Sequence, residues 1–244
     1  MTQREIGNPL YFRQLLAGRD FAHGDTVATQ MMNFAYLIGD KDTRECLLVD
    51  PAWDVESLVK VARTDDMKVV GVLGSHYHPD HLGGDMMGYS VEGAKRLLEL
   101  LPVKIHVQEK EVPWVKRVTG LSDSDLAPHA GGDILQVGNV PIQFVHTPGH
   151  TQGSTCFLVG GRRLVAGDTL FVGSCGRVDL PGSDPEEMYR SLTQRLAKLP
   201  DDVMLYPGHN YGPTPSSTLG AERLFNTSMK VPTLQQWLSM MGSA

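Results

Sequence analysis

The heptapeptide SHYHPDH, residues 75–81, places three imidazoles and a carboxylate within six positions. Such groups are costly to gather on one short loop unless a charged partner satisfies them. Because successive residues alternate direction at the end of a strand, His76 and His78 can point one way. Asp80 and His81 can then point to a second place beside it. Neutral imidazole and carboxylate are ligands for zinc, iron and manganese, so this segment predicts two neighbouring cations.

Three later segments repeat this placement, because each follows a strand-like apolar run and forms a turn. Proline and glycine make rigid turns that present His150 and His209 at their tips. Two adjacent cations need a bridging carboxylate, and Asp168 follows its strand more directly than most acids of the chain. His146 continues its strand, so we interpret it as structural. The three segments are HTPGH (146–150), GDT (167–169) and PGHNY (207–211).

The rest of the chain alternates strand-like and helix-like pieces, with no linker long enough to mark a domain boundary. Apolar residues between Val55 and Ala62 fall at helical spacing, which predicts an amphipathic helix. Asp184 and Pro185 predict the start of a second helix, and Gly160-Gly161 predicts a hairpin turn. Strands joined by hairpins and by helices indicate mixed sheets covered by helices. The expected strands are residues 46–50, 68–74, 140–146, 155–159, 162–166 and 203–206.

The composition is that of an ordinary globular protein, with 41% hydrophobic and 20% charged residues. A net charge of −6 argues against nucleic acid or an acidic membrane as the partner. No run approaches the roughly 20 apolar residues of a membrane span, and residues 1–7 lack the apolar core of a secretory signal. The three cysteines are far apart, so we expect neither a disulfide framework nor a thiolate zinc site. These features predict a cytoplasmic protein.

In this order, HYHPDH, HTPGHT, GDT and PGHN resemble the signature of the metallo-β-lactamase superfamily. The resemblance extends from Asn33 to Asn226, which is nearly the whole chain. It implies an α+β fold, an αββα sandwich of two mixed sheets flanked by helices, with the metals at one edge of the sheets. It also implies that His76, His78 and His150 bind one metal, that Asp80, His81 and His209 bind the other, and that Asp168 bridges them.

The same resemblance implies two divalent metal ions, with zinc as the first choice and iron or manganese as alternatives. A hydroxide shared by two cations exists at neutral pH because the cations lower the pKa of water. It would attack a carbonyl group that one cation polarises, so no serine or cysteine nucleophile is needed. The carboxylates of Asp80 and Asp168 are the ligands that we expect to be catalytic.

GDTLF (167–171), GSCGR (173–177) and the helix that begins at Asp184 are similar to the glyoxalase II group, the hydroxyacylglutathione hydrolases. These enzymes hydrolyse thiolesters with zinc, iron or manganese. In them a basic residue and a tyrosine contact glutathione, at positions that match Arg177 and Tyr211. A guanidinium is a good partner for a carboxylate because it can bind two oxygens at once. A surface salt bridge is the alternative role for this arginine.

The chain departs from glyoxalase II in two ways. Asp179 stands where that group has a second tyrosine, and the chain ends soon after His209 without the full C-terminal helical domain. The resemblance is therefore closer to short, single-domain thiolester hydrolases. We expect a small-molecule thiolester substrate, with a glutathione-linked one as the main candidate.

A second class of enzyme stays open. Residues 36–51 and 217–226 also resemble persulfide dioxygenases, which hold a single iron at positions that match His76, His150 and Asp168. The HTPGHT form and the long insertion described next favour hydrolysis. A lactonase or a β-lactamase is a further alternative.

We expect one domain over residues 1–244, with a helical insertion over residues 88–130. Apolar residues between Val91 and Leu101 form a helical stripe, and Trp114 follows it. The stripe could roof the active site or pair with a second subunit in a homodimer. An extra packed surface helix explains the pattern equally well.

Overall fold

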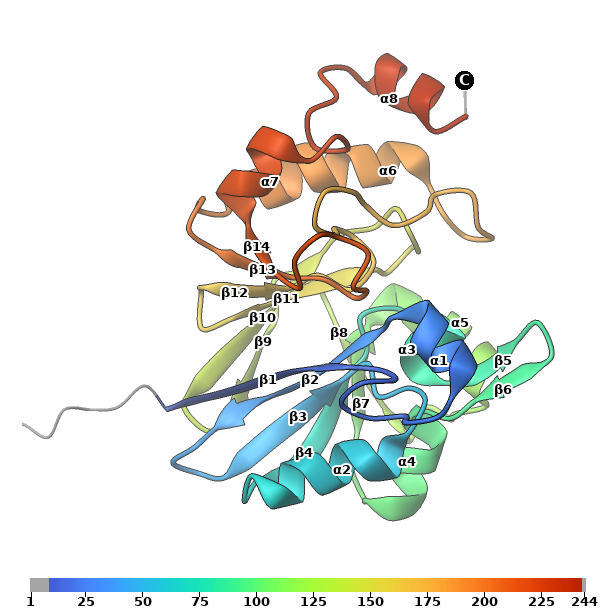
Figure 1. Ribbon diagram of the computed structural model, residues 1–244, viewed down its shortest axis with the longest axis vertical. Helices are drawn as coiled ribbons and strands as arrows, with labels where there is room; N and C mark the ends of the chain where they lie inside the picture. Colours follow the sequence, from blue (N-terminus) through green and yellow to red (C-terminus); the bar gives the residue numbers. More distant parts are fainter. Residues whose placement is uncertain (1–8, 243–244) are drawn as a thin grey trace, which may run out of the picture.

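The computed structural model of the 244-residue chain describes residues 9–242. Two six-stranded sheets pack face to face, and helices cover the outer face of each sheet, which gives four layers (Figure 1). Each sheet contains parallel as well as antiparallel neighbours. The expected αββα sandwich of mixed sheets, an α+β fold, is therefore confirmed. Among the described residues, no helix has the length and apolar character needed to cross a membrane.

The order of the strands explains why several loops meet at one edge. Four consecutive strands of the first sheet run parallel, so their carboxyl ends lie on the same side. In order, the first sheet consists of β1 (Leu10–Leu16), β2 (Phe34–Asp40), β3 (Glu45–Val49), β4 (Lys68–Leu73), β7 (Ile105–Gln108) and β8 (Leu126–His129). The second consists of β14 (Ser217–Thr218), β13 (Met204–Tyr206), β12 (Arg163–Val165), β11 (Thr155–Val159), β10 (Val140–His146) and β9 (Ile134–Val137). A separate hairpin pairs β5 (Gly84–Met86) with β6 (Tyr89–Val91).

The core between the sheets follows from the alternation of side chains along β2. Phe34, Tyr36 and Ile38 pack with residues of the second sheet. Ala35 and Leu37 point to the opposite face and pack with the helices that cover the first sheet. Because both faces of β2 are buried, the strand reads as a nearly continuous apolar run.

Two helices begin where the sequence predicts them. Asp54 caps α2 (Val55–Thr64), whose four predicted apolar positions are buried. Asp184 caps α6 (Pro185–Arg190) and accepts a hydrogen bond of 3.0 Å from the backbone nitrogen of Glu187. The other helices are α1 (Thr26–Met31), α3 (Pro79–Leu82), α4 (Ala94–Leu100), α5 (Val112–Thr119), α7 (Leu219–Phe225) and α8 (Leu234–Met240).

The helix that starts at Asp184 changes its pitch along its length. After α6 the chain forms a π-helical segment, η2 (Ser191–Arg195), and then a 3-10 turn, η3 (Leu196–Lys198). The apolar side chains of this helix still face the second sheet, because Met188, Leu192 and Leu196 are all buried.

Residues 88–130 contain strands as well as helices. The segment holds α4 and α5 as expected, but also β6, β7 and β8, and the 3-10 turn η1 (Glu109–Glu111). β7 pairs with β4, and β8 pairs with β7, so the segment completes one side of the first sheet. A purely helical insertion is therefore a wrong expectation. Two four-residue strands carry too short a pattern to be recognised without their partner strands.

Candidate metal centre

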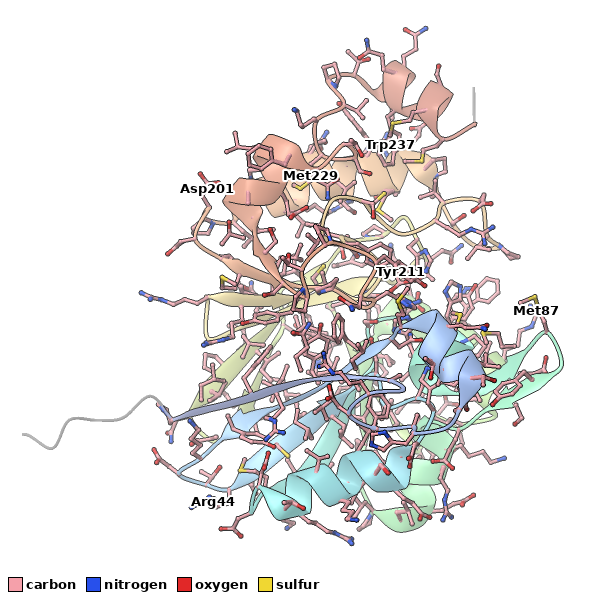
Figure 2. All side chains as sticks on the ribbon, in the orientation of Figure 1. Arg44, Met87, Asp201, Tyr211, Met229 and Trp237 are labelled. Carbon is pink, nitrogen blue, oxygen red and sulfur yellow. The ribbon has the colours of Figure 1, made fainter. Side chains whose placement is uncertain are left out.

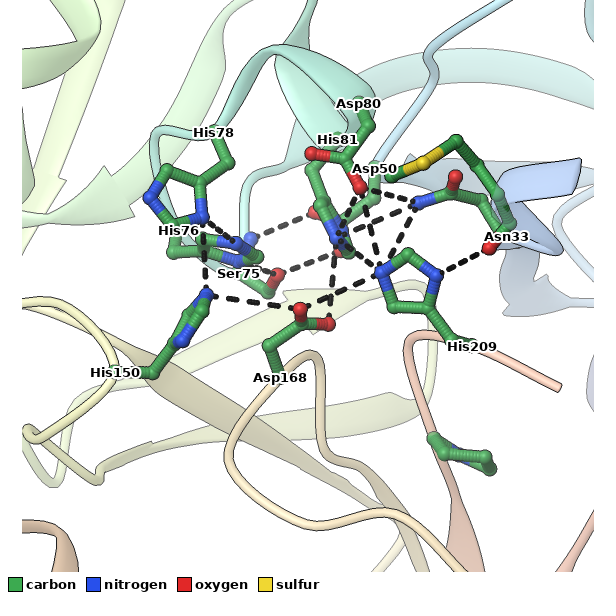
Figure 3. A network of polar contacts seen from close by, with 12 residues as sticks. Asn33, Asp50, Ser75, His76, His78, Asp80, His81, His150, Asp168 and His209 are labelled. Atoms are coloured by element: carbon green, nitrogen blue, oxygen red, sulfur yellow. Dashed lines mark hydrogen bonds and ion pairs between the residues drawn. The ribbon is translucent and has the colours of Figure 1, made fainter. Parts of the chain in front are cut away.

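The seven predicted ligand side chains meet at one edge of the two sheets (Figure 3). Each comes from a segment that directly follows a strand, as the sequence predicts. In chain order, His76 and His78 follow β4, Asp80 and His81 lie in α3, His150 follows β10, Asp168 follows β12 and His209 follows β13. The backbone thus brings together residues that lie up to 133 positions apart (76 to 209).

The first donor set consists of three imidazoles, His76, His78 and His150. His78 Nδ1 lies 3.0 Å from His76 Nε2 and 3.0 Å from His150 Nε2, so the three nitrogens converge on one point. Burial lowers the pKa of His78 to about 4, and burial together with the neighbouring imidazoles lowers the pKa of His76. These rings are therefore neutral at physiological pH, which is the state that binds a metal.

The second donor set consists of Asp80, His81 and His209. His81 Nε2 lies 3.4 Å from Asp80 Oδ2 and 3.2 Å from His209 Nε2, and His209 Nε2 lies 3.3 Å from Asp80 Oδ2. Four donors placed around zinc at its usual bond lengths lie about 3.3 Å from each other, so the spacing fits one cation.

The carboxylate of Asp168 lies between the two sets, as Figure 3 shows. Its Oδ1 is 3.3 Å from His81 Nε2, and its Oδ2 is 3.4 Å from His209 Nε2 and 3.6 Å from His150 Nε2. Oδ1 is buried and has no hydrogen-bond partner among the described residues. A buried carboxylate oxygen without a donor is costly, and a shared cation would satisfy it.

Backbone carbonyls fix the tautomers of two ligands. His150 Nδ1 donates to the carbonyl oxygen of Arg177, and His209 Nδ1 donates to that of Met31, each at 2.7 Å. Because a carbonyl oxygen only accepts, the proton is on Nδ1 and the lone pair of Nε2 points into the centre. Each Nε2 faces Asp168, so it needs either a proton or a cation between itself and that carboxylate.

Without cations, protons lie between the imidazole nitrogens and the carboxylates of the second set. Burial lowers the pKa of His209, but the charges of Asp168 and Asp80 outweigh burial and raise this pKa to about 9. Burial raises the pKa of Asp168, but His209 and His81 hold it well below its usual value. Cations that bind here would displace protons from imidazole nitrogens that already point at carboxylates.

Two polar residues outside the seven predicted ligands hold the ligands in place. Asp50 accepts hydrogen bonds from the backbone nitrogen of Ser75 at 2.7 Å and from His81 Nδ1 at 2.9 Å. Asn33 Nδ2 donates to Asp80 Oδ2 at 3.0 Å. Asp50 directly follows β3, so the signal that selects Asp168 could also have found it. Nothing in the sequence around Asn33 sets it apart.

The two predicted substrate-binding residues lie in different surroundings. Tyr211 stacks on His209, with ring centroids 4.6 Å apart and an interplanar angle of 13°, and its side chain is 48% exposed. Figure 2 shows it between the two halves of the sandwich. The guanidinium of Arg177 is exposed and forms two hydrogen bonds with Asp179, at 2.8 and 2.7 Å. Tyr211 therefore borders the centre, while Arg177 is paired within the protein.

The chain is similar to known proteins of one superfamily. The family model of the metallo-beta-lactamase superfamily matches residues 28–209. A hydroxyacylglutathione hydrolase of Polaromonas is 34% identical over 182 residues, which cover 73% of this chain and 62% of that protein. The human persulfide dioxygenase ETHE1 is 26% identical over 212 residues, which cover 86% of this chain and 76% of that protein. The chain thus spans less than two thirds of the Polaromonas hydrolase.

Solved structures give a similar result. The crystal structure of ETHE1 from Myxococcus xanthus superposes with a TM-score of 0.77 at 27% identity, covering 95% of this chain and 90% of that one. The protein TTHA1623 in a di-iron-bound form superposes with a TM-score of 0.63 at 30% identity, covering 81% and 95%. One neighbour therefore holds two metal ions in this fold.

Proposed function

Since the chain belongs to the metallo-β-lactamase superfamily, we propose that it is a dinuclear metal-dependent hydrolase of thiolesters such as S-2-hydroxyacylglutathione. The observation that carries this proposal is the presence of two converging donor sets with the Asp168 carboxylate between them. The hydroxyacylglutathione hydrolase relatives support the substrate class. Zinc is the first candidate for both ions, with iron and manganese as alternatives.

When bound, two divalent cations would lower the pKa of water and polarise an acyl carbonyl oxygen. The protein would hold the two cations in place and balance their charge with its carboxylates. We propose that Asp168 bridges the two positions and that Asp80, held by Asn33, is the other catalytic carboxylate. Tyr211 offers an aromatic face and a hydroxyl at the border of the centre, where a substrate would lie.

Arg177 is the proposed partner for a carboxylate of the thiol carrier, because a guanidinium can bind both oxygens at once. We also propose a cytoplasmic location. The cysteines of the chain are all free, which suits a reducing compartment.

Hydrolysis of S-D-lactoylglutathione, measured together with the metal content, tests the proposal. We expect turnover that requires about two metal ions per chain and that disappears after chelation. Absence of turnover by the protein with both ions bound would exclude this thiolester as the substrate.

A mononuclear iron persulfide dioxygenase is the second candidate. It is favoured by structural similarity, since the Myxococcus ETHE1 structure superposes on 95% of this chain with a TM-score of 0.77. In that case His76, His150 and Asp168 would hold one iron. The remaining ligand candidates would lie around this iron without binding a metal themselves: His78, Asp80, His81 and His209. Oxygen uptake with glutathione persulfide, at about one iron per chain, would support this candidate over the hydrolase.

A further inference from the structure

A buried carboxylate outside the seven ligands joins the two loops that carry the first donor set. Glu111 lies at the end of η1 and is fully buried. Its Oε2 accepts a hydrogen bond of 2.8 Å from the backbone nitrogen of Tyr77. Its Oε1 accepts from Thr151 Oγ1 and from the backbone nitrogen of Gly153, each at 2.7 Å.

These three donors flank the ligands of the first set. Tyr77 lies between His76 and His78, and Thr151 directly follows His150. We propose that Glu111 is a positioning residue that fixes the distance between the two loops and thereby shapes the first metal position before any ion binds. The inference rests on the proposed metal centre, but not on thiolester chemistry.

A carboxylate suits this place better than an amide would. Backbone N–H groups can only donate, so the oxygens that face Tyr77 and Gly153 must both accept. Glutamine has a single oxygen, and its NH₂ group would face one of these donors. Burial raises the pKa of Glu111, and its three hydrogen bonds act in the opposite direction. The set of donors therefore favours the ionised form in a place where a lone charge would be costly.

The fit around this carboxylate is close. A Cβ atom built on Gly153 would lie 2.7 Å from Glu111 Cγ and 2.8 Å from the Glu111 backbone nitrogen. The loop after His150 can approach η1 this closely only because residue 153 has no side chain.

The same segment of chain also holds the ring of Tyr77. Trp114, in α5, stacks on this ring with centroids 4.9 Å apart and an interplanar angle of 16°. The Tyr77 hydroxyl donates to the carbonyl oxygen of Pro181 at 2.8 Å. Residues 109–119 therefore hold both the backbone and the ring of Tyr77, which lies between two predicted ligands. Through this contact the 88–130 segment supports the metal centre.

Glu111→Gln tests the inference, and Asp40→Asn is the matched control. Asp40 is also fully buried and accepts from Asn139 N at 2.6 Å, from Asn139 Nδ2 at 2.8 Å and from Asp42 N at 2.8 Å. It lies at the end of β2 opposite to Asn33, so it has no contact with the metal centre. Both substitutions replace a buried carboxylate, which accepts several hydrogen bonds that include backbone N–H groups, with an amide.

Two readouts separate positioning from general stability. In a His209→Ala background, which removes a donor of the second set, Co²⁺ is titrated into the metal-free protein and its absorption is followed. We expect Glu111→Gln to weaken this binding about 10- to 100-fold and to change the spectrum, as supporting partners of metal ligands do. Amide hydrogen exchange at Tyr77 and Gly153 should speed up in the metal-free variant, while Asp40→Asn leaves both readouts unchanged.

Unchanged Co²⁺ affinity in Glu111→Gln, or an equal loss in both variants, would overturn the inference. If Glu111→Gln does not fold, Thr151→Val replaces it, because valine keeps the shape and removes one donor to Glu111. If Thr151→Val loses less Co²⁺ affinity than is expected of Glu111→Gln, the inference is supported. If Thr151→Val loses no Co²⁺ affinity, the inference is contradicted. These results do not depend on substrate, so a protein inactive on thiolesters would still decide the role of Glu111.

Discussion

Trp53 Nε1 donates a hydrogen bond of 3.1 Å to Asn33 Oδ1, and this bond determines which way the Asn33 amide faces. With Oδ1 held by the indole, Nδ2 points at the second donor set and donates to Asp80. Both side chains are buried, so no solvent competes for these bonds. The indole therefore acts, through one amide, on the orientation of a predicted metal ligand.

Trp53→Phe is expected to weaken binding of the metal ion at the second donor set and to leave binding at the first donor set unchanged. Phenylalanine keeps an aromatic ring but removes the N–H, so the amide of Asn33 is free to rotate away from Asp80. We expect a loss of about 10- to 100-fold in affinity for one of two ions, measured by competition with a chelator. The control is Trp237→Phe, which removes an indole N–H that donates to Pro185 O at 2.7 Å, outside the second sheet. Equal metal affinities in both variants would contradict this role.

The ligands could be predicted because their chemistry permits few residue types. His76, His150 and Asp168 each combine a metal-binding side chain with a place directly after a strand, and both features are visible in the sequence. Two of the residues that support the ligands do not show these two features together in the sequence. Asn33 and Glu111 act through ordinary hydrogen bonds to partners 47 and 34 positions away, and many polar residues could do the same. Their roles follow from the folded geometry alone.

The same distinction applies to the fold. Gly160-Gly161 joins β11 to β12 as predicted, because both residues adopt a positive φ that glycine tolerates. β7 was not predicted, because its four residues gain their register only from pairing with β4 and β8. The pitch change after Arg190 was also invisible, since the apolar spacing of a π-helical segment differs from that of an α-helix by less than one residue per turn.

Asp168→Ala is expected to remove both metal ions. The carboxylate contacts ligand nitrogens of both sets, so its loss would leave two cations facing each other without a shared anion. Elemental analysis after gel filtration should find far less metal than in the wild type. Asp179→Ala is the control, because it removes an exposed acid that pairs with Arg177 and not with a predicted metal ligand. Full occupancy of both positions in Asp168→Ala would refute the bridging assignment.

Substitutions of Arg177 and Asp179 are expected to change the KM for a glutathione thiolester in opposite directions. If the guanidinium binds a carboxylate of the carrier, Arg177→Ala raises KM and leaves kcat nearly unchanged, because such a remote contact binds ground state and transition state alike. Asp179→Ala removes the internal competitor of that carboxylate and lowers KM. The second effect is expected to be only a few-fold, since exposed ion pairs are weak. Steady-state kinetics that show the same KM in both variants would exclude a substrate contact by Arg177.

His106 is expected to make the stability of the protein sensitive to mild acid. Burial, together with the neighbouring His129 whose Nε2 lies 2.9 Å from His106 Nδ1, lowers the pKa of His106 from 6.5 to about 4. Between these two pKa values the unfolded chain binds a proton at His106, while the folded chain does not. The stabilisation is complete above the unfolded pKa and is lost as the pH falls from 6.5 towards 4.

His106→Gln removes this proton linkage, so its urea unfolding free energy should fall less steeply with pH than that of the wild type. The difference in slope is at most about 1.4 kcal/mol per pH unit, and partial exposure of the ring reduces it. The exposed His23 provides the control substitution, His23→Gln. Parallel stability curves for the wild type and His106→Gln between pH 6.5 and 4 would mean that the folded protein takes up this proton as easily as the unfolded chain does.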